Sequence, residues 1–458
     1  MNYTEAVDYI QSFPDMERGT HGSRGPTMSL DAMKALLRRL GEPQQGRHTI
    51  HVTGSKGKGS TSTMIASVLH EAGFETALFT SPHLHSYTER ILFNQKPISE
   101  ERFARGISEL KEAIDDELNS GAGPFSTFGI LTALFFYLTS RLDPPVQWQV
   151  VEVGIGGRFD ATNVFDTKDV AVITAISLEH TEILGSSQTE IAANKAGIIT
   201  PGCFAVLGPQ KDPSVRSSIG RKCHHVGAAL IDVRRTYKVK AQSHGLKGQS
   251  FTMEGGMKGP AQYEIPLLGS FQVDNASTAA AVCSALMDRG VEISQKNIED
   301  GLKKVHIPGR LEIVAGKGTD HNADGPTIVV DGAHNHESAA ALTASLRSLF
   351  GKPSVIFIVG VNSDKNISAI WRELSPLSKS LIVTRSSSGR AMDPTEIAEG
   401  IGMQTQVAPT VAPNLTDAMK LALETAKPED VICITGSLYL VADARSWIKN
   451  NTAPDSES

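Results

Sequence analysis

One stretch near the N-terminus constrains the fold of this chain more than any other. Residues 50–53 read as a short buried strand, glycines interrupt the pattern at positions 54, 57 and 59, and residues 60–72 resume with apolar residues at helical spacing. The stretch therefore predicts a strand, a glycine-rich turn and the start of a helix, in that order.

This arrangement favours a bound polyphosphate. The first N–H groups of a helix lack internal partners, and the helix dipole adds about +0.5 charge at that end. Glycines let the backbone approach an anion, Lys58 adds a full positive charge, and hydroxyl groups follow at 60 and 61, where they could bind phosphate or Mg²⁺. The residues predicted to contact a nucleotide here are Gly54, Gly57, Lys58, Gly59, Ser60 and Thr61.

Neither common nucleotide fingerprint fits in full. A Walker A loop, GxxxxGK[ST], needs glycine at position 52, which is Val52, so the pattern GSKGKGS leaves an ordinary strand-to-helix turn as the alternative. A second glycine-rich stretch, 154–157, would need glycine at position 159 for a dinucleotide fingerprint, and Phe159 stands there. A Rossmann dinucleotide site is therefore disfavoured.

Composition excludes several classes of protein. The 458 residues, 40% of them hydrophobic and 21% charged, can form two or three domains. A net charge of −6 with interspersed signs argues against nucleic-acid or membrane-surface partners. Four widely spaced cysteines suggest neither a zinc site nor a disulfide framework. The N-terminus lacks signal-peptide features, and the apolar run 131–138 is too short to span a membrane, so a cytoplasmic location is expected.

The spacing of strands and helices predicts an α/β protein with two sheets. Helical patterns cover 29–40, with Ser29 as N-cap, and 127–142, and a small antiparallel addition is predicted within about 225–268. Beyond Pro308 and Gly309, strands at 327–330, 354–359, 380–384 and 430–435 alternate with helical patterns, which predicts a doubly wound parallel sheet. The predicted domains are 1–306, of P-loop ATPase type, and 307–450, followed by a disordered tail, 451–458.

Many motifs in this order resemble the folylpolyglutamate synthase and dihydrofolate synthase family, within the Mur-type amide ligases. The motifs in the first half are HVTGSKGKGS (51–60), LFTSPHL (78–84), VVEVGIGGRFDATNV (150–164), LEHTEILG (178–185) and KAGI (195–198). Those in the second half are GSFQVDNA (269–276), PGRLE (308–312), DGAHN (331–335), GRAM (389–392) and TGSLYLVADAR (435–445).

The resemblance implies an ATP- and Mg²⁺-dependent ligase. In such an enzyme the carboxylate of dihydropteroate or a reduced folate is phosphorylated to an acyl phosphate, and the amine of glutamate attacks it. The expected partners are these small molecules, with no nucleic acid and no membrane, and the expected state is a monomer. Two alternatives stay open: another Mur-type acid–amino acid ligase, and a P-loop kinase or nucleotide switch that forms no amide.

Residue roles in the first half follow from the matched motifs. Ser81, Glu152 and His180 resemble the magnesium set of the family, although a lone Ser in a turn or His after a strand is more often structural. Lys195 resembles a lysine that carries a carbamate (N6-carboxylysine), which would require a neutral amine and hence a lowered pKa. A lysine at the end of a helix is otherwise usually a partner of the helix dipole.

Further roles are implied in the second half. Gln272 and Asn275 resemble residues placed against the nucleotide, and Arg310 resembles an arginine that reaches the phosphates. Asp331 and His334 resemble contributions to ATP binding and catalysis, with domain closure expected to assemble the site. A plain turn with an N-cap would also satisfy residues 331–335.

Four positions depart from the common family pattern: Lys56 replaces Asn, Glu179 replaces Asp, Phe271 replaces His and Ile307 replaces Trp. Lys56 adds a charge beside the expected phosphates, and Phe271 makes the role of Gln272 less secure. None of the four removes a group that acyl phosphate chemistry requires.

Overall fold

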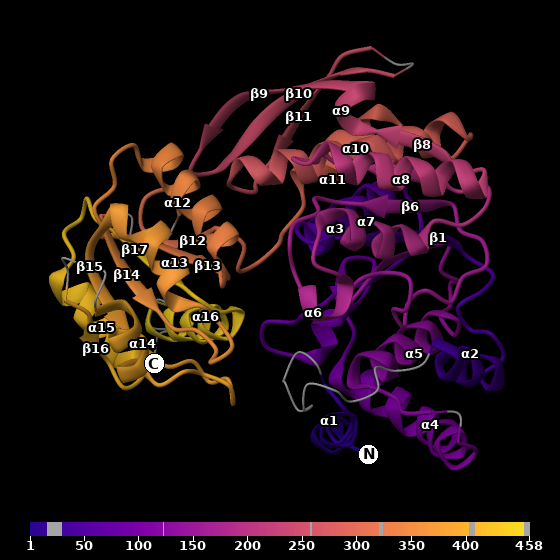
Figure 1. Cartoon of the computed structure of the whole chain (residues 1–458), viewed down its shortest axis with the longest axis horizontal. Coiled ribbons are helices and arrows are strands. Elements are labelled where there is room, and N and C mark those ends of the chain that lie inside the picture. Colours follow the sequence, from indigo (N-terminus) through magenta and orange to yellow (C-terminus); the bar gives the residue numbers. More distant parts are fainter. Residues whose placement is uncertain (16–29, 122, 257–258, 320–323, 403–407, 453–458) are drawn as a thin grey trace, which may run out of the picture. The chain divides into compact units, whose positions relative to one another are not determined.

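The computed structural model describes residues 1–15, 30–121, 123–256, 259–319, 324–402 and 408–452 (Figure 1). The predicted cap Ser29 and most of the predicted tail lie outside these residues. The chain divides into two compact units. Unit 1 comprises Met1–Ala241, Phe251–Ile265 and Gln272–Val305, and unit 2 comprises Gln242–Ser250, Pro266–Phe271 and His306–Ser458.

Unit 1 is built on one eight-stranded sheet in the order β4-β3-β2-β5-β1-β6-β7-β8. The six strands from β2 to β8 in that order are parallel, while β3 and β4 add an antiparallel edge. The strands are β1 (His48–Thr53), β2 (Thr76–Phe79), β3 (Ile91–Phe93), β4 (Lys96–Pro97), β5 (Trp148–Glu152), β6 (Val170–Ile173), β7 (Phe204–Leu207) and β8 (Ala229–Asp232). The predicted mainly parallel sheet is confirmed.

The register of the strands shows where a ligand-binding site can form in this sheet. Val52 of β1 lies beside Glu152 of β5, Thr53 lies beside Ile173 of β6, and Phe79 of β2 lies beside Val151. The loops after these four strands therefore leave the sheet at the same carboxyl edge. In open parallel sheets that edge is the usual place for ligands.

The helices of unit 1 bury the apolar faces that the sequence patterns predict. The fully buried Phe79 of β2 stacks on Phe135 of α5, with ring centroids 5.2 Å apart. α11 packs on α3, where the hydroxyl of Ser67 donates to the Gly301 carbonyl over 2.7 Å. The helices are α1 (Tyr3–Gln11), α2 (Leu30–Arg39), α3 (Lys58–Glu71), α4 (Glu100–Asn119), α5 (Thr127–Thr139), α6 (Thr181–Leu184), α7 (Gln188–Lys195), α8 (Pro213–Val226), α9 (Val233–Thr236), α10 (Ser270–Asp288) and α11 (Gln295–Lys303), with 3₁₀ turns at Tyr87–Arg90 and Ala196–Ile198.

The predicted antiparallel addition is a three-stranded sheet in the order β11-β10-β9. β9 (Tyr237–Gly245) and β10 (Gly248–Gly255) are neighbours joined by two residues, and a link that short joins only antiparallel strands. The third strand is β11 (Ala261–Ile265). One part of the predicted range differs, because β8 joins the large sheet and runs parallel to β7.

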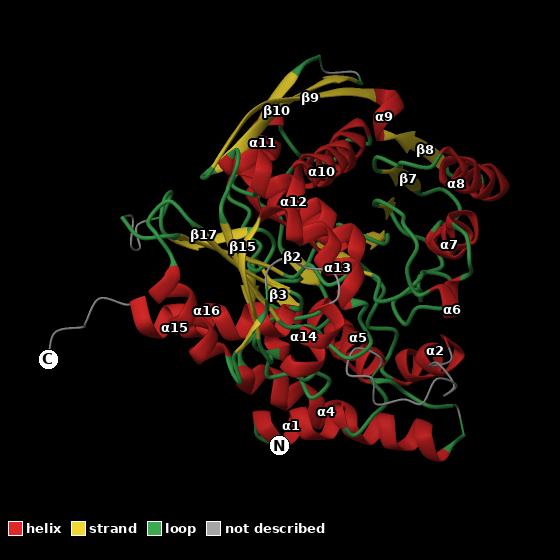
Figure 2. Cartoon of the chain, turned by 60° about the vertical axis from the view of Figure 1, so that its left-hand side comes forward, coloured by secondary structure: helices red, strands yellow, loops and turns green. Residues whose placement is uncertain are grey.

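Unit 2 contains a six-stranded sheet in the order β12-β13-β17-β14-β15-β16. Only β12 is antiparallel to its neighbour. All five residues of β14 are buried, as a sheet covered on both faces requires. Figure 2 shows α12 and α13 on one side of β15 and β17, and α15 and α16 on the other, which confirms the doubly wound arrangement. The strands are β12 (Glu312–Ala315), β13 (Thr327–Asp331), β14 (Val355–Val359), β15 (Ser378–Val383), β16 (Thr410–Val411) and β17 (Val431–Thr435).

The helices of unit 2 follow its strands in the expected places. They are α12 (His336–Phe350), α13 (Ile367–Leu374), α14 (Pro394–Gly402), α15 (Leu415–Thr425) and α16 (Leu438–Thr452), with a 3₁₀ turn at Ser375–Leu377. α16 extends two residues into the range predicted as a tail. Throughout the described ranges, no helix combines the length and the apolar character needed to cross a membrane.

Candidate functional site

The loop between β1 and α3 has a shape that only glycine permits at two positions. Gly54 and Gly57 have φ angles of 153° and 85°. A Cβ on Gly54 would lie 1.8 Å from Thr174 Oγ1, and a Cβ on Gly57 would lie 2.1 Å from Asn275 Oδ1. The amides of Ser55 and Lys56 donate to the carbonyl of residue 175, over 2.8 and 3.1 Å, and fix the other side of the loop.

The helix that follows the loop presents its N-terminus without a side-chain cap in the described structure. Lys58 opens α3, and its Nζ donates to the Gly54 carbonyl over 3.2 Å. Ser60 and Thr61 are buried, and among the described atoms the Thr61 hydroxyl has no hydrogen-bond partner. Helix amides, a lysine and hydroxyls around a glycine-only turn fit the phosphates of a nucleotide.

Two of the three predicted magnesium ligands meet beside this loop. Glu152, at the end of β5, is 3% exposed, and its Oε2 accepts the Ser81 amide over 2.9 Å. A Cβ on Gly59 would lie 3.2 Å from the same Oε2, so this carboxylate lies at the start of α3. A carboxylate and a nearby hydroxyl fit Mg²⁺, which prefers oxygen ligands and retains several waters.

The third predicted ligand, His180, occupies the loop after β6. It has a φ of 45°, precedes α6 and is exposed. In the described part of the chain, no group of three or more His, Cys, Asp or Glu side chains gathers around a possible ion. The predicted magnesium set contains two residues of these types, Glu152 and His180, together with Ser81, and its assignment stays a prediction.

Lys195 lies at the end of α7 with its side chain almost fully buried. Its Nζ donates to the Gly54 carbonyl over 2.9 Å and contacts Glu179 Oε1 at 3.0 Å. Burial lowers the pKa of Lys195 to about 8, and the Glu179 charge offsets part of the shift. Burial alone would raise the pKa of Glu179, but the charges of Lys195 and Lys58 lower it overall.

The glycine-rich stretch 154–157 packs against the end of α7. A Cβ on Gly156 would lie 2.6 Å from Asn194 Oδ1, and one on Gly157 would lie 2.9 Å from the Lys195 carbonyl oxygen. Close packing between loop and helix thus accounts for these glycines. They place Lys195 next to the loop that follows β1.

Asn275 and Gln272 are both buried on α10, and Asn275 lies against the β1–α3 loop. The Asn275 amide donates to Gln272 Oε1 over 2.9 Å, and Asn275 Oδ1 lies against Gly57. The structure therefore brings these two predicted residues to the loop, although they are distant in sequence.

In unit 2, the predicted residues gather where β13 ends. Asp331 accepts the amides of Leu311 and Ala333 over 2.8 and 2.9 Å. Burial raises the pKa of Asp331, and the charge of Arg310 opposes the shift. His334 Nδ1 lies 2.8 Å from the Gly332 carbonyl, so Nδ1 carries the proton of the neutral ring.

The N-cap interpretation of residues 331–335 is correct for Asn335, which accepts the Ser338 amide over 2.9 Å and caps α12. The sequence analysis missed a second polar group in this unit. Asn362, Thr384 and Ser386 follow β14 and β15, are buried, and each has an oxygen without a hydrogen-bond partner in the described structure. Polar residues directly after apolar strands were the available signal.

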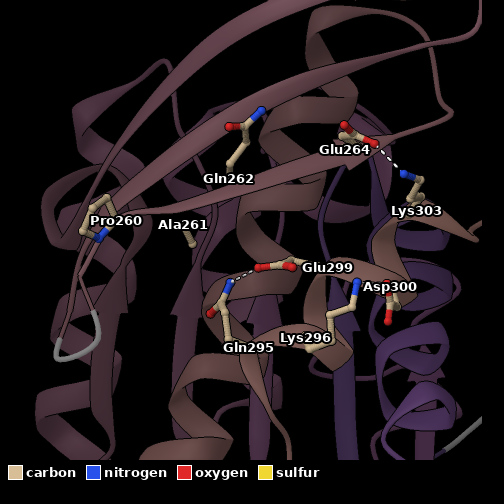
Figure 3. Close-up of a pocket in the computed structure, with 9 residues that line it drawn as sticks. All are labelled: Pro260, Ala261, Gln262, Glu264, Gln295, Lys296, Glu299, Asp300 and Lys303. Atoms are coloured by element: carbon tan, nitrogen blue, oxygen red, sulfur yellow. Dashed lines mark hydrogen bonds and ion pairs between the residues drawn. The ribbon is translucent and has the colours of Figure 1, made fainter.

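A pocket between β11 and α11 is separate from these residues (Figure 3). Its charged side chains pair with one another, Lys303 with Glu264 at 2.8 Å and Lys296 with Asp300 at 2.7 Å. None of its nine lining residues belongs to the predicted site. We therefore assign the pocket no role in the chemistry.

Comparison with known proteins matches both halves of the chain. Residues 137–283 match the Mur ligase middle domain, and residues 309–438 match the Mur ligase glutamate ligase domain. The chain is 33% identical over 454 residues to folylpolyglutamate synthase from Lacticaseibacillus casei, covering 98% of this chain and 99% of the relative. It is also 33% identical to dihydrofolate synthase/folylpolyglutamate synthase from Mycobacterium tuberculosis, covering 91% and 89%. The solved structure of Mycobacterium tuberculosis folylpolyglutamate synthase complexed with ADP matches with a TM-score of 0.86 and 30% identity, over 98% and 99% of the two chains.

Proposed function

The chain belongs to the folylpolyglutamate synthase family of Mur-type ligases, and from this premise we propose the reaction and the residues that carry it out. It is an ATP-dependent acid–amino acid ligase that uses Mg²⁺. The acids are dihydropteroate, reduced folates or both, and the amine is L-glutamate. The observation that carries the assignment is the loop 54–59, which requires glycine at positions 54 and 57 and where Lys58, Lys195 and the start of α3 meet.

The reaction proceeds in two steps. An oxygen of the pterin acid carboxylate attacks the γ-phosphorus of ATP, and ADP leaves with the electron pair of the broken P–O bond. The glutamate amine then attacks the acyl carbon of the acyl phosphate, inorganic phosphate leaves, and the amine loses a proton as the amide forms. Phosphorylation is needed because a carboxylate oxygen is a poor leaving group.

Unit 1 supplies most of the phosphate-binding groups in this proposal. Lys58 and the amides of Gly57, Gly59 and Ser60 bind the β- and γ-phosphates, where negative charge develops. Ser81, Glu152 and His180 would hold Mg²⁺, which supplies neutralisation of phosphate charge. Gln272 and Asn275 contact the nucleotide beside Gly57, and the Thr61 hydroxyl adds a donor for the phosphates.

We assign Lys195 a carbamate in the active enzyme. Its neutral amine attacks CO₂, forms an N–C bond and releases a proton, and a pKa of about 8 leaves an appreciable neutral fraction near neutral pH. The product anion would position the acyl phosphate or a second metal ion.

Arg310, Asp331 and His334 supply the contribution of unit 2. Arg310 binds phosphate oxygens, and Asp331 and His334 serve ATP binding and catalysis. The proposed domains are 1–306 and 307–450. A monomer in the cytoplasm, without a nucleic-acid or membrane partner, completes the proposal.

The test is to incubate the purified protein with ATP, Mg²⁺, glutamate and each pterin acid separately, and to identify the products by mass. The proposal predicts ADP release that depends on both glutamate and the acid, and a product heavier by one glutamyl residue. ADP release without glutamate would indicate a kinase, and slow hydrolysis with neither substrate would indicate a nucleotide switch.

A further inference from the structure

The connection between β5 and β6 is unusual for a parallel sheet. These strands lie on either side of β1, so residues 153–169 must pass over one face of β1. Parallel crossovers generally contain a helix, whereas this segment, which the structure describes throughout, contains none. Other contacts must therefore hold the segment in place.

Two polar side chains of β1 make such contacts. His51 and Thr53 are two residues apart on the strand and so point to the same face. The Thr53 hydroxyl donates to the Gly156 carbonyl over 2.6 Å, and His51 Nε2 lies 2.8 Å from Thr162 Oγ1. Both partners belong to the crossing segment.

His51 is hydrogen-bonded through both of its ring nitrogens, to Thr162 on one side and to Lys168 on the other. The position of each proton follows from which atoms can only accept a hydrogen bond. Asp160 accepts the amides of Ile155 and Thr162 over 3.0 Å each, and its Oδ1 lies 2.5 Å from the Thr162 hydroxyl. The Thr162 hydroxyl therefore gives its one proton to Asp160 and accepts from His51 Nε2–H. His51 Nδ1 is then an acceptor, and Lys168 Nζ donates to it over 2.9 Å.

The four residues of this hydrogen-bonded series, Asp160, Thr162, His51 and Lys168, are buried. His51 and Thr162 are completely inaccessible, and Lys168 is 7% exposed. Burial lowers the pKa of Lys168 to about 7, and burial together with the Lys168 charge lowers the pKa of His51. The other polar partner of Lys168 Nζ is the neutral Asn163 Oδ1 at 3.5 Å. Buried polar groups of this kind lose stability and order when one partner is removed.

The Asp160 end of this hydrogen-bonded series lies near Lys195, the proposed carbamate-bearing lysine. Asp160 holds the Ile155 amide, and the stretch that contains Ile155 packs against the end of α7. The Arg158 amide also donates to the Asn194 carbonyl over 3.0 Å. A shift of this stretch would therefore displace Lys195 from the β1–α3 loop.

We infer that His51, Thr162 and Lys168 are positioning residues for the ligation, and that they act by holding the 154–157 stretch against Lys195. The inference rests on the proposed function. It predicts that breaking this hydrogen-bonded series lowers kcat more than it changes the KM for ATP, because the side-chain hydrogen bonds of its four members in the described structure reach none of the residues assigned to the phosphates.

The experiment compares Thr162→Val, which removes the hydroxyl at nearly constant volume, with the matched control Thr162→Ser, which keeps it. Glutamate-dependent ADP release gives kcat and the KM for ATP, and thermal unfolding identifies the temperature range where each variant is folded. For Thr162→Val we expect a fall in kcat of about 10- to 100-fold, in line with the effect of a displaced reacting group, and a KM for ATP within threefold of wild type. Thr162→Ser should retain at least a third of wild-type kcat.

Either of two kinetic results would overturn the inference: a kcat within twofold of wild type in folded Thr162→Val, or an equal loss in Thr162→Ser. A second measurement serves if Thr162→Val does not fold. Nitrogen-15 spectra of the wild-type protein, with His51 assigned through His51→Gln, should show a neutral ring with the proton on Nε2 at pH 7. A proton on Nδ1 or a charged ring would refute the chain. If wild type itself shows no glutamate-dependent turnover, the proposed function fails, while the spectra still test the chain.

Discussion

Gly57 offers the most quantitative test of the proposed phosphate site. Alanine at this position would have to adopt a φ of 85°, and its Cβ would lie 2.1 Å from Asn275 Oδ1. A left-handed conformation costs a non-glycine residue roughly 1–2 kcal/mol. Displacing Asn275 would also break its 2.9 Å hydrogen bond to Gln272, with a net loss of about 1 kcal/mol.

The two terms sum to about 2–3 kcal/mol, or about 30- to 150-fold in an equilibrium or rate constant. The loop of Gly57→Ala relieves this strain by leaving the phosphate-binding conformation, and ATP binding must then restore it. We therefore expect kcat/KM for ATP to fall by about that factor, measured as glutamate-dependent ADP release at varied ATP.

The other end of the same helix provides a matched control. Gly73, just after α3, has a φ of 87°, and a Cβ there would meet nothing within 4 Å. Gly73→Ala should lower the free energy of unfolding by about 1–2 kcal/mol and leave the KM for ATP unchanged. A kcat/KM within threefold of wild type in Gly57→Ala would refute the assigned loop geometry.

Four further predictions follow from the site. Lys58→Ala should lower glutamate-dependent turnover by about 10²-fold or more, as removal of an aligned donor to developing charge does, and near-normal turnover would remove Lys58 from the phosphate site. Lys195→Ala should be impaired and partly rescued by added short carboxylates, whereas an unmodified lysine in intact-mass spectra under bicarbonate would contradict the carbamate. Glu152→Gln should raise the Mg²⁺ concentration for half-maximal turnover by at least about tenfold, and an unchanged Mg²⁺ titration would exclude this ligand. The pKa of Lys168 in the folded state, about 7, is below its ordinary value of 10.5, so the unfolded protein binds more protons between these two pH values. The contribution of Lys168 to the free energy of unfolding therefore rises with pH above about 7 and is lost as the pH falls towards 7. The stability of Lys168→Met relative to wild type, from urea unfolding, should therefore be highest at pH 6 and decline towards pH 9; a difference independent of pH would contradict the lowered pKa.

The sequence was sufficient where the signal is local. The β1 strand, the glycine turn and α3 lie within one short window, and apolar runs mark the four central strands of unit 2 correctly. Motif order also led to Asn275 and Gln272, which the structure places against Gly57.

Features that depend on distant contacts could not be predicted in this way. β8 (Ala229–Asp232) is a short, partly buried edge strand whose four residues do not indicate which strand they pair with, so its parallel pairing with β7 could not be predicted from the sequence. β12 and β16 are likewise short strands at the two edges of their sheet. His51 reads as one more member of a buried strand, and its contact with Lys168 joins residues 117 positions apart.

The acyl phosphate is the central claim, and an oxygen-18 label tests it most directly. Pterin acid labelled in its reacting carboxylate is incubated with the protein, ATP, Mg²⁺ and glutamate, and the inorganic phosphate is analysed by mass. Transfer of one labelled oxygen to phosphate for each amide formed is the predicted result, because the attacking carboxylate oxygen leaves with the phosphoryl group. Amide formation with unlabelled phosphate would contradict the account.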